Sequence, residues 1–276
     1  MTGTAVETPA AVLVLAGQRA GAADPLLAVT GHAAKALVPV AGRTMLSRVV
    51  EALHAGAGGA ACYTSGLAPE HLAQAGLPED VAVTPLAGSS GPAASVIAAI
   101  EAGGLPTPLL VTTCDHPLLR PEIVAHFLAE ARASGADIAV GLAERSVIET
   151  AFPGARRTYL RLGGTGYSGC NLFYIARPAG LAAVRFWQEA ERDRKRPWRI
   201  ARRFGVGSLL WLLLARPGPD AAFAHLSRRL GVRAAPVILP FAEAAMDVDK
   251  PADLAEAEAL LGARQAAPAA APDGGA

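Results

Sequence analysis

The chain has 276 residues, of which 25 are Lys or Arg and 24 are Asp or Glu, so its formal net charge at pH 7 is +1. This balance argues against a nucleic-acid-binding protein, because such a protein carries a clear positive excess. Aromatic residues make up only 5% of the chain, so its core must consist mainly of Ala, Val and Leu. The length alone fits one large domain or two small ones.

The mean hydropathy of the chain is +0.32. No apolar run, however, approaches the roughly 18 to 20 residues that a membrane span needs, and the abundance of alanine explains the value. The first residues, MTGTAVETPA, lack the charged and apolar regions of a signal peptide. The three cysteines, Cys62, Cys114 and Cys170, are odd in number and far apart, which favours reduced thiols over a disulfide framework. We therefore expect a cytoplasmic protein.

The first apolar run, Ala11–Ala16, predicts a buried parallel strand. Gly17 follows it directly, and a glycine there lets the backbone turn sharply and approach a ligand closely. The N–H groups of such a loop can cradle phosphates, and Arg19 and Lys35 supply the positive charge that a triphosphate needs. The spacing of Gly17 and Gly21 fits neither the Rossmann fingerprint nor the Walker loop. We expect a strand followed by an anion-binding loop.

Strands and helices then alternate along the chain, which predicts βαβ units and a mostly parallel sheet. The expected elements are a helix at 44–55, a strand at 60–64, a helix at 69–75 and a strand at 81–84. A glycine-rich loop with Gly88 and Gly91 leads into a helix at 92–102, where Pro92 takes a favoured first position. These glycines free the backbone to contact a ligand, although an ordinary loop before a helix would look the same.

The next strand is expected at 108–113, and Asp115 follows it. In an open α/β sheet, ligands gather outside the carboxyl ends of the strands, so a carboxylate at this position is poised to hold a metal ion. The competing interpretation is that Asp115 caps the helix that Pro121 begins. That helix is expected at 121–134, and a further strand at 136–142.

Two short strands, at 158–161 and 171–176, are expected to flank the turn-rich stretch GGTGYSGC. The segment 185–203 follows with eight basic and three acidic residues, and the apolar run 204–215 comes next. Such a segment can bind a phosphorylated acceptor, with Lys195 and Arg199 on one helix face, or can lie on an anionic membrane surface through Arg185–Ala215. A solvated helix face followed by a core helix remains equally open.

After a strand at 237–239, the chain closes with the stretch MDVDKPADL. Side chains two apart in a strand share a face, so Asp247 and Asp249 are expected to point the same way. Asp253 lies in the first turn of a helix expected at 252–261, where a carboxylate stabilises the positive helix end.

Four of these stretches, in this order, resemble the NTP transferases related to the molybdenum-cofactor guanylyltransferase and the sugar-phosphate pyrophosphorylases. They are the opening loop, the glycine-rich loop before Pro92, the stretch DHPLL and the stretch DVDKP. The residues of the opening signature are Leu15, Ala16, Gly17, Arg19, Gly21, Lys35, Leu37, Val40, Gly42 and Met45. Gln18 stands where the family has a second glycine, and the interval from Gly17 to Lys35 is longer than usual, so we expect a larger loop.

The resemblance implies a single α/β domain of the nucleotide-diphospho-sugar transferase type (GT-A-like, Rossmann-like), with a mixed sheet flanked by helices. The domain is expected at 10–262, with a basic acceptor-side insertion at about 177–235. Residues 1–9 and 263–276 are expected to be disordered, the latter because an Ala/Pro/Gly-rich tail has nothing to bury.

The resemblance also implies roles for individual residues. Lys35, Arg19 and Asp115 would be catalytic, and Asp115 would hold Mg²⁺ together with Asp249 or Asp247. His116 would pack or face the substrate. The implied nucleotide-binding residues are Leu15, Ala16, Gly17, Gln18, Gly21, Gly88, Gly91 and Ser95. The implied acceptor-binding residues are Gly169 and Asn171, although Asn171 fits a satisfied amide at a strand end nearly as well.

The reaction implied is transfer of a nucleoside monophosphate from an NTP to a phosphorylated alcohol, sugar or lipid precursor, with release of pyrophosphate. A phosphate nucleophile is already ionised at neutral pH, so no general base is required. A general likeness to enzymes that activate small phosphorylated alcohols favours CTP over GTP. The alternatives are a glycosyltransferase of the same fold and a non-catalytic nucleotide-binding or membrane-peripheral protein. The sequence leaves the acceptor and the oligomeric state open.

Overall fold

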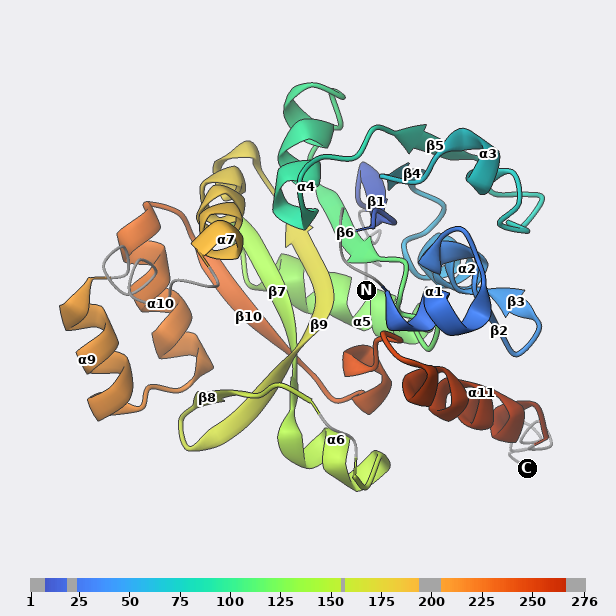
Figure 1. Cartoon of the computed structure of the whole chain (residues 1–276). Helices are drawn as coiled ribbons and strands as arrows, with labels where there is room; N and C mark the ends of the chain where they lie inside the picture. The colour runs from blue at the N-terminus through green and yellow to red at the C-terminus, as the bar shows by residue number, and fades with distance from the viewer. Residues whose placement is uncertain (1–7, 19–23, 155–156, 194–204, 267–276) are drawn as a thin grey trace, which may run out of the picture.

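A computed structural model describes residues 8–18, 24–154, 157–193 and 205–266 of the chain. Its centre is an eight-stranded sheet with the strand order β10-β7-β9-β6-β1-β4-β5, and β8 pairs with β9. Helices cover both faces of this sheet (Figure 1). Within the described part of the chain, β9 is the one strand of the sheet that runs against the others. The expected mixed, mostly parallel α/β sheet is confirmed.

The strands of the main sheet are β1 (Ala11–Leu15), β4 (Ala61–Ser65), β5 (Val83–Leu86), β6 (Leu109–Thr113), β7 (Ile138–Glu144), β8 (Leu160–Leu162), β9 (Thr165–Ile175) and β10 (Ala234–Leu239). Two further strands, β2 (Pro39–Val40) and β3 (Arg43–Thr44), form a small antiparallel ladder of their own.

The α-helices are α1 (Pro25–Thr30), α2 (Met45–Gly56), α3 (Pro69–Leu72), α4 (Pro92–Glu101), α5 (Pro121–Ala133), α6 (Arg145–Ala151), α7 (Leu181–Asp193), α9 (Val206–Ala215), α10 (Pro219–Leu230) and α11 (Pro251–Ala266). Three short 3₁₀ helices complete the described structure, namely η1 (Lys35–Leu37), η2 (Pro178–Gly180) and η3 (Ala242–Ala245).

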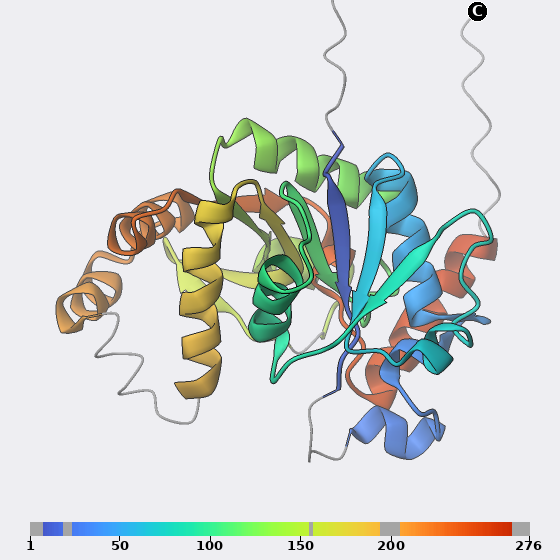
Figure 2. The ribbon, with the colours of Figure 1, turned by 90° about the horizontal axis from the view of Figure 1, so that it is seen from above.

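The two faces of the sheet bury separate apolar cores, because successive side chains of a strand point to opposite faces. On β1, Val12 and Val14 belong to the core under α2 and α5, whereas Leu13 and Leu15 belong to the core under α4 and α7. Figure 2 shows the two helix pairs on opposite sides of the strands. Every residue of β1 is buried, as expected of a central parallel strand.

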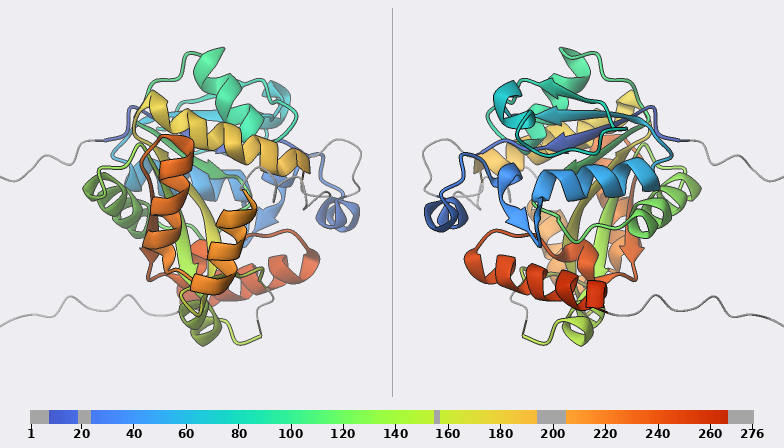
Figure 3. Two further views of the ribbon diagram at one scale, coloured as in Figure 1. Left: turned by 90° about the vertical axis from the view of Figure 1, so that its left-hand side faces the viewer. Right: turned by 90° about the vertical axis from the view of Figure 1, so that its right-hand side faces the viewer.

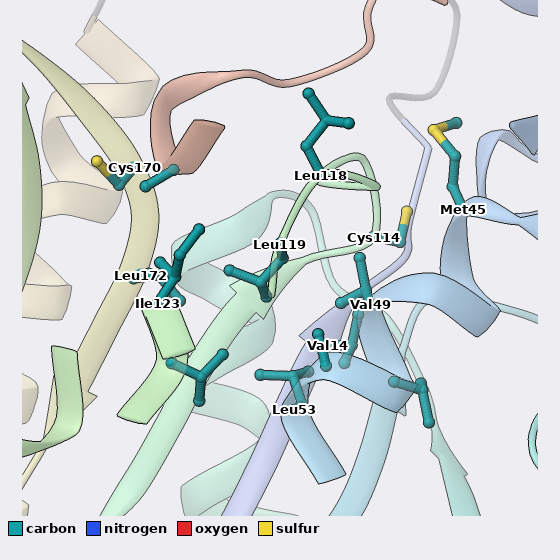
Figure 4. Close-up of a cluster of buried hydrophobic side chains, with 14 of the residues drawn as sticks. Val14, Met45, Val49, Leu53, Cys114, Leu118, Leu119, Ile123, Cys170 and Leu172 are labelled. Carbon is teal, nitrogen blue, oxygen red and sulfur yellow. The ribbon is translucent and has the colours of Figure 1, made fainter. Parts of the chain in front are cut away.

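Helix α2 shows how the sequence builds the first of these cores. Met45, Val49 and Leu53 recur every four residues, so they form one stripe along the helix, and all three are buried. Thr44 begins the helix by accepting a hydrogen bond from the Ser47 N–H at 3.1 Å. Figure 4 shows this stripe together with side chains of β1, β9, α5 and the stretch after β6, such as Leu118.

The stretch GGTGYSGC differs from the prediction. Only Gly163 and Gly164 form the turn between β8 and β9, and β9 runs through the rest of the stretch to Ile175. Asn171 therefore lies inside a strand and not at its end. The pairing of β7 with β9 shifts register at this level, between Val140 and Leu142, and Asn171 has a φ of +49°. Such a bulge re-aims side chains, which a regular strand pattern cannot predict.

Three other expectations change at their boundaries. Helix α11 continues to Ala266, so residues 263–266 are helical where a disordered tail was expected; residues 1–7 and 267–276 lie outside the described residues. Strand β5 begins at Val83, two residues later than expected, and α3 ends at Leu72. Residues 246–249, which carry the two closing aspartates, are not in a strand.

The expected insertion between β9 and β10 contains η2, α7, α9 and α10. Helix α10 lies against the edge strand β10, and α9 lies outside α10 at the periphery of the molecule (Figures 1 and 3). One open interpretation placed this apolar run in a core helix; it does form a helix, but none of its described side chains belongs to either apolar core. Among the described helices, none combines the length and apolarity needed to cross a membrane.

The packing of α2 on α5 predicts opposite effects for two glycine-to-alanine changes. A Cβ at Gly56 would lie 2.6 Å from the Pro121 carbonyl oxygen and 2.6 Å from Val124 Cβ, whereas a Cβ at Gly262 in α11 meets nothing within 4 Å. Gly56→Ala should lower the free energy of unfolding by about 1–3 kcal/mol through overpacking. Gly262→Ala should raise it by up to about 1 kcal/mol, because alanine stabilises a helix. Urea denaturation of both variants measures the free energy of unfolding. Stabilisation by both substitutions would contradict the tight contact at Gly56.

Candidate active site

The carboxyl ends of β1, β4 and β6 meet at one edge of the sheet, and hydrogen bonds continue the pairing beyond the strands. The Ala16 N–H donates to the Ser65 carbonyl oxygen at 2.9 Å, and the Cys114 N–H donates to the Leu15 carbonyl oxygen at 3.0 Å. The residues after β1 are therefore fixed beside the residues after β6. This edge is where open α/β sheets bind their ligands.

Three glycines, Gly17, Gly66 and Gly88, lie in direct backbone contact at this edge. A Cβ at Gly66 would lie 2.6 Å from Gly17 Cα, and a Cβ at Gly88 would lie 2.7 Å from Gly66 Cα. Gly66 also has a φ of +87°, which side chains rarely allow. Gly66 was not among the predicted site residues, although it follows its strand as Gly17 follows β1. The contact leaves a side-chain-free backbone surface that a ligand can approach.

Ser95 holds the loop that carries Gly88 and Gly91. It is buried near the start of α4, and its hydroxyl accepts a hydrogen bond from the Ser89 N–H at 3.0 Å. Gly91 precedes α4 as its N-cap residue with an extended backbone. The described structure thus gives Ser95 a positioning role, and its contact with a nucleotide base stays a prediction. At the opening loop, the Gln18 side-chain amide donates to the Ala33 carbonyl oxygen at 2.9 Å.

Lys35 is the centre of the polar cluster at this edge. Its Nζ donates a hydrogen bond to Asp249 Oδ1 and lies 3.7 Å from Asp115 Oδ2 and 4.0 Å from Asp24 Oδ2. Burial alone would lower the pKa of Lys35, but the bond to Asp249 and the three negative charges raise it above 10.5. The ammonium group is therefore charged at any physiological pH. Three carboxylates drawn from distant parts of the sequence face one cation.

Asp24 was not predicted, although its type and position carry a signal. Its carboxylate accepts hydrogen bonds from the Leu26 and Leu27 N–H groups at 2.9 and 3.2 Å and so begins α1 before Pro25. An aspartate directly before a proline-led helix is a recognisable cap. Asp24 also faces Lys35. This second contact joins two separate segments, so the local sequence could not predict it.

Asp115 has one carboxylate oxygen that the described structure leaves without a partner. Its Oδ1 is buried and accepts no hydrogen bond, while its Oδ2 faces Lys35. A buried carboxylate oxygen without a partner indicates a missing ligand, since such groups are costly to leave unpaired. Helix α5 has Arg120 as its N-cap, without a side-chain hydrogen bond, so the interpretation of Asp115 as the cap of this helix is wrong.

The residues at this edge fit a magnesium ion that is shared with a substrate. Mg²⁺ is usually bound by one or two protein carboxylates together with phosphate oxygens and water, not by a complete protein cage. Asp115 and the half-exposed Asp249 flank the same lysine and offer two such carboxylates. Among the described residues, no group of three or more His, Cys, Asp and Glu side chains could hold a metal ion by itself.

The segment that carries Asp249 is held by backbone and side-chain bonds. The Val248 N–H donates to the Asp115 carbonyl oxygen at 2.9 Å, so the two aspartate-bearing segments are joined directly. Asp253 Oδ2 accepts the N–H groups of Asp249 at 3.0 Å and Lys250 at 2.9 Å. Asp253 lies in the first turn of α11, as predicted, and its two bonds fix the segment of Asp249 and Lys250 that leads into the helix.

Asp247 and Asp249 have different partners, and whether their side chains point the same way stays a prediction. Residues 246–249 are not in a strand; Asp247 forms an ion pair with Arg157, whereas Asp249 bonds to Lys35. Arg157 also donates to the Asp247 carbonyl oxygen at 3.3 Å. Arg157 was not predicted, and no local pattern around it marks it. The pairing leaves Asp249 as the carboxylate that faces the Lys35 cluster together with Asp115.

His116 lies next to Asp115 but is almost wholly buried, with 1% of its surface exposed. Both ring nitrogens lack a hydrogen-bond partner in the described structure. Burial lowers the pKa of His116, so the imidazole is neutral near pH 7. Its burial agrees with the expectation of a residue that packs or faces substrate.

The remaining predicted residues divide into two groups. On the acceptor side, Gly169 is exposed on β9, and Asn171 is half-buried in the bulge two residues further on. Gly169 pairs with Leu142 of β7. The other predicted residues, Arg19, Gly21, Lys195 and Arg199, lie outside the described residues.

The sheet order, its side-chain-free carboxyl edge and the lysine among aspartates define an α/β nucleotidyltransferase fold. Residues 12–196, more than half of the chain, match the MobA-like NTP transferase domain. The chain belongs to this family.

The solved structures that are similar to the chain include the following three. A hypothetical transferase from Thermus thermophilus has 32% identity and a TM-score of 0.74, covering 88% of this chain and 98% of that one. CMP:2-keto-3-deoxy-manno-octonic acid synthetase in complex with CTP has 16% identity and a TM-score of 0.53, covering 92% and 99%. Rv0371c from Mycobacterium tuberculosis H37Rv has 15% identity and a TM-score of 0.50, covering 91% and 99%. The last two likenesses concern the fold alone. The comparison with curated proteins gives no match.

The contact among the three glycines predicts a difference between two alanine variants that both need a positive φ. Gly31 has a φ of +71° with nothing within 4 Å of an added Cβ, so Gly31→Ala should cost only the backbone strain, about 1–2 kcal/mol. Gly66→Ala adds a clash with Gly17 Cα and should lower the free energy of unfolding by about 2–5 kcal/mol. Denaturant titration measures the free energy of unfolding of the two variants. Equal losses of stability would show that the Gly17–Gly66 contact imposes no packing constraint.

Proposed function

We propose that the protein transfers a nucleoside monophosphate from an NTP to a phosphorylated acceptor and releases pyrophosphate. The observation that supports this most is the charged Lys35 held between Asp115 and Asp249 beside the glycine-lined edge. A cation, a backbone surface and two carboxylates are the groups that position and neutralise a triphosphate.

Lys35 is proposed to stabilise the pyrophosphate leaving group. In the described structure its ammonium group is balanced by aspartates, and phosphate oxygens of a bound NTP can replace one of them at the exposed side of Asp249. The N–H groups of Gly17 and Gln18, which follow the end of β1, are proposed to add further donors. Arg19 is proposed to add a second positive charge. Together these donors stabilise the charge that develops on pyrophosphate.

Asp115 and Asp249 are proposed to hold Mg²⁺, with the unpartnered Asp115 Oδ1 as the first ligand atom. When bound, the ion neutralises phosphate charge and orients the phosphates for in-line displacement. The hydrogen bond from the Asp249 N–H to Asp253 and the one from the Val248 N–H to the Asp115 carbonyl oxygen hold the segments of the two proposed ligands together. Asp247 is the less suitable second ligand because Arg157 already occupies its carboxylate.

A general base is not needed, since an acceptor phosphate is ionised at neutral pH. The acceptor is proposed to lie on the β9 side of the edge, near Gly169 and Asn171, with Lys195 and Arg199 as further candidates for its phosphate. Arg157 adds a partly buried cation close to Asp247 on this side. The preference for CTP over GTP depends only on the general sequence likeness to enzymes that activate phosphorylated alcohols.

The proposal is tested by incubating the full chain with each NTP, Mg²⁺ and a panel of phosphorylated alcohols and sugars, and by measuring pyrophosphate. Release that requires both an NTP and an acceptor is the expected result, with CTP first. Transfer of sugar from a nucleotide sugar without pyrophosphate would favour a glycosyltransferase of the same fold. NTP binding with no turnover on any acceptor would favour a non-catalytic nucleotide-binding protein.

Removing one metal-binding carboxylate should abolish most of the activity. Asp115→Asn and Asp249→Asn are each expected to lower turnover at least about 100-fold and to raise the Mg²⁺ concentration needed for half-maximal rate, because metal binding and transition-state charge are weakened together. Steady-state kinetics over a Mg²⁺ series measures both effects, and circular dichroism checks the fold. The control is Asp80→Asn, because Asp80 is a largely exposed aspartate outside the cluster.

Asp247→Asn distinguishes the two closing aspartates. We expect it to lower stability through loss of the Arg157 pair while leaving the Mg²⁺ requirement unchanged. A raised Mg²⁺ requirement in Asp247→Asn with a normal one in Asp249→Asn would reverse the assignment. Near-normal turnover in a folded Asp115→Asn variant would remove the metal site altogether.

A further inference from the structure

Helix α9 is apolar along nearly its whole length, and its single polar side chain faces α10. Ser208 lies 2.8 Å from His225 Nε2 and accepts a hydrogen bond from Arg229 at 3.0 Å. One turn further on, Trp211 stacks on the His225 ring with 4.6 Å between the ring centroids. This side of α9 is therefore attached to the body of the protein through α10.

The opposite side of α9 is exposed and carries large apolar side chains. Leu210 and Leu214 have 51% and 80% of their surface exposed. At 100° per residue they lie about 40° apart on the helix and turned away from Ser208. Because the two leucines are one turn apart on the same face, they form a contiguous apolar patch, and such patches are candidate sites for an apolar partner. We call Leu210 and Leu214 the α9 face; α9 forms the outer rim of the molecule (Figures 1 and 3).

The sequence around this face is strongly basic, while the rest of the chain is acidic. The stretch 194–233 holds ten of the 25 basic residues and one of the 24 acidic residues, Asp220, so it carries +9 against −8 for the remainder. Within the described part of this stretch, Arg216, Arg228 and Arg233 are exposed. The α9 face thus belongs to a strongly basic part of the sequence, and this combination of apolar surface and positive charge is complementary to an anionic lipid surface, which offers both negative headgroups and hydrocarbon.

We propose that the α9 face docks the protein onto an anionic membrane. The helix would lie in the plane of the interface, because ten residues extend only about 15 Å and cannot cross the bilayer. A second copy of the chain fits the face less well: a two-fold contact would oppose two basic stretches, and two exposed leucines are far from the roughly 800 Å² per partner of a stable interface. The proposal does not depend on the proposed function.

The position of α9 also separates docking from catalysis. Helix α10 lies between α9 and β10, which is the edge strand farthest in the sheet order from β5, whereas the Lys35 cluster lies at the ends of β1 and β6. Changing Leu210 or Leu214 should therefore leave the nucleotide site intact. This separation allows the docking surface to be tested without disturbing the catalytic groups.

The test is flotation of the full chain with vesicles of phosphatidylcholine alone or with 30–40% phosphatidylserine or phosphatidylglycerol, at low and high salt. We expect binding to the anionic vesicles at low salt, at least a tenfold loss in neutral vesicles, and weakening as salt rises because exposed charges are screened. The double variant Leu210→Gln/Leu214→Gln keeps every charge and should lower the partition coefficient at least tenfold.

Val29→Gln is the matched control. Val29 is 71% exposed on α1, on the other side of the molecule from α9, and its replacement should leave vesicle binding unchanged. Circular dichroism and unchanged thermal unfolding of each variant check the fold. The proposal is overturned by absence of binding to anionic vesicles at low salt, and equally by binding that the double leucine variant retains. Concentration-dependent dimerisation in sedimentation, lost in that variant and without vesicle binding, would assign the face to a second copy.

Discussion

The candidate site depends on one electrostatic arrangement, in which the Lys35 ammonium group faces Asp24, Asp115 and Asp249. Each of these aspartates belongs to a different part of the fold: the start of α1, the end of β6 and the segment before α11. Partial burial disfavours the charge of a lysine unless opposite charges compensate the desolvation, and here they do so strongly enough to raise the pKa of Lys35. The same compensation places two carboxylates beside a backbone surface free of side chains. Lys35 thus joins three separate segments at this edge, and in the proposed reaction it also supplies a cation for the substrate.

Much of this edge was accessible from the sequence because it is encoded locally. The run Ala11–Leu15 with Gly17 after it, the strand before Asp115 and the proline-led helix after Gly91 each follow from a few neighbouring residues, and the order of the elements gives the sheet. The position of Asp253 in the first turn of α11 likewise follows from the local sequence. These features depend on strand length, glycine position and helix-start chemistry, which short windows of sequence contain.

What the sequence could not supply depends on contacts between distant residues. The sequence did not reveal that Asp247 pairs with Arg157, 90 residues away, whereas Asp249 bonds to Lys35. Gly66 could be recognised as a site residue only once β1 and β4 were known to be neighbours, because its role depends on its backbone contact with Gly17. Asn171 looked like a strand end because turn residues precede it, whereas a register shift against β7 places it in a bulge. In each case the deciding partner lies on another element.

The bonds from residues 248 and 249 back to Asp115 and Lys35 have a consequence for how the protein is made. Lys35 and Asp249 are 214 positions apart, so nearly the whole chain must leave the ribosome before this pair can form. A nascent chain that has completed β1 to β10 would hold the strands but not the closing segment that α11 anchors. Contacts of such sequence separation also form late, because loop closure must precede them. In the proposed mechanism, Asp249 therefore joins the Lys35 cluster only after the segment before α11 has been made and has docked, so the proposed site would be complete only late in synthesis.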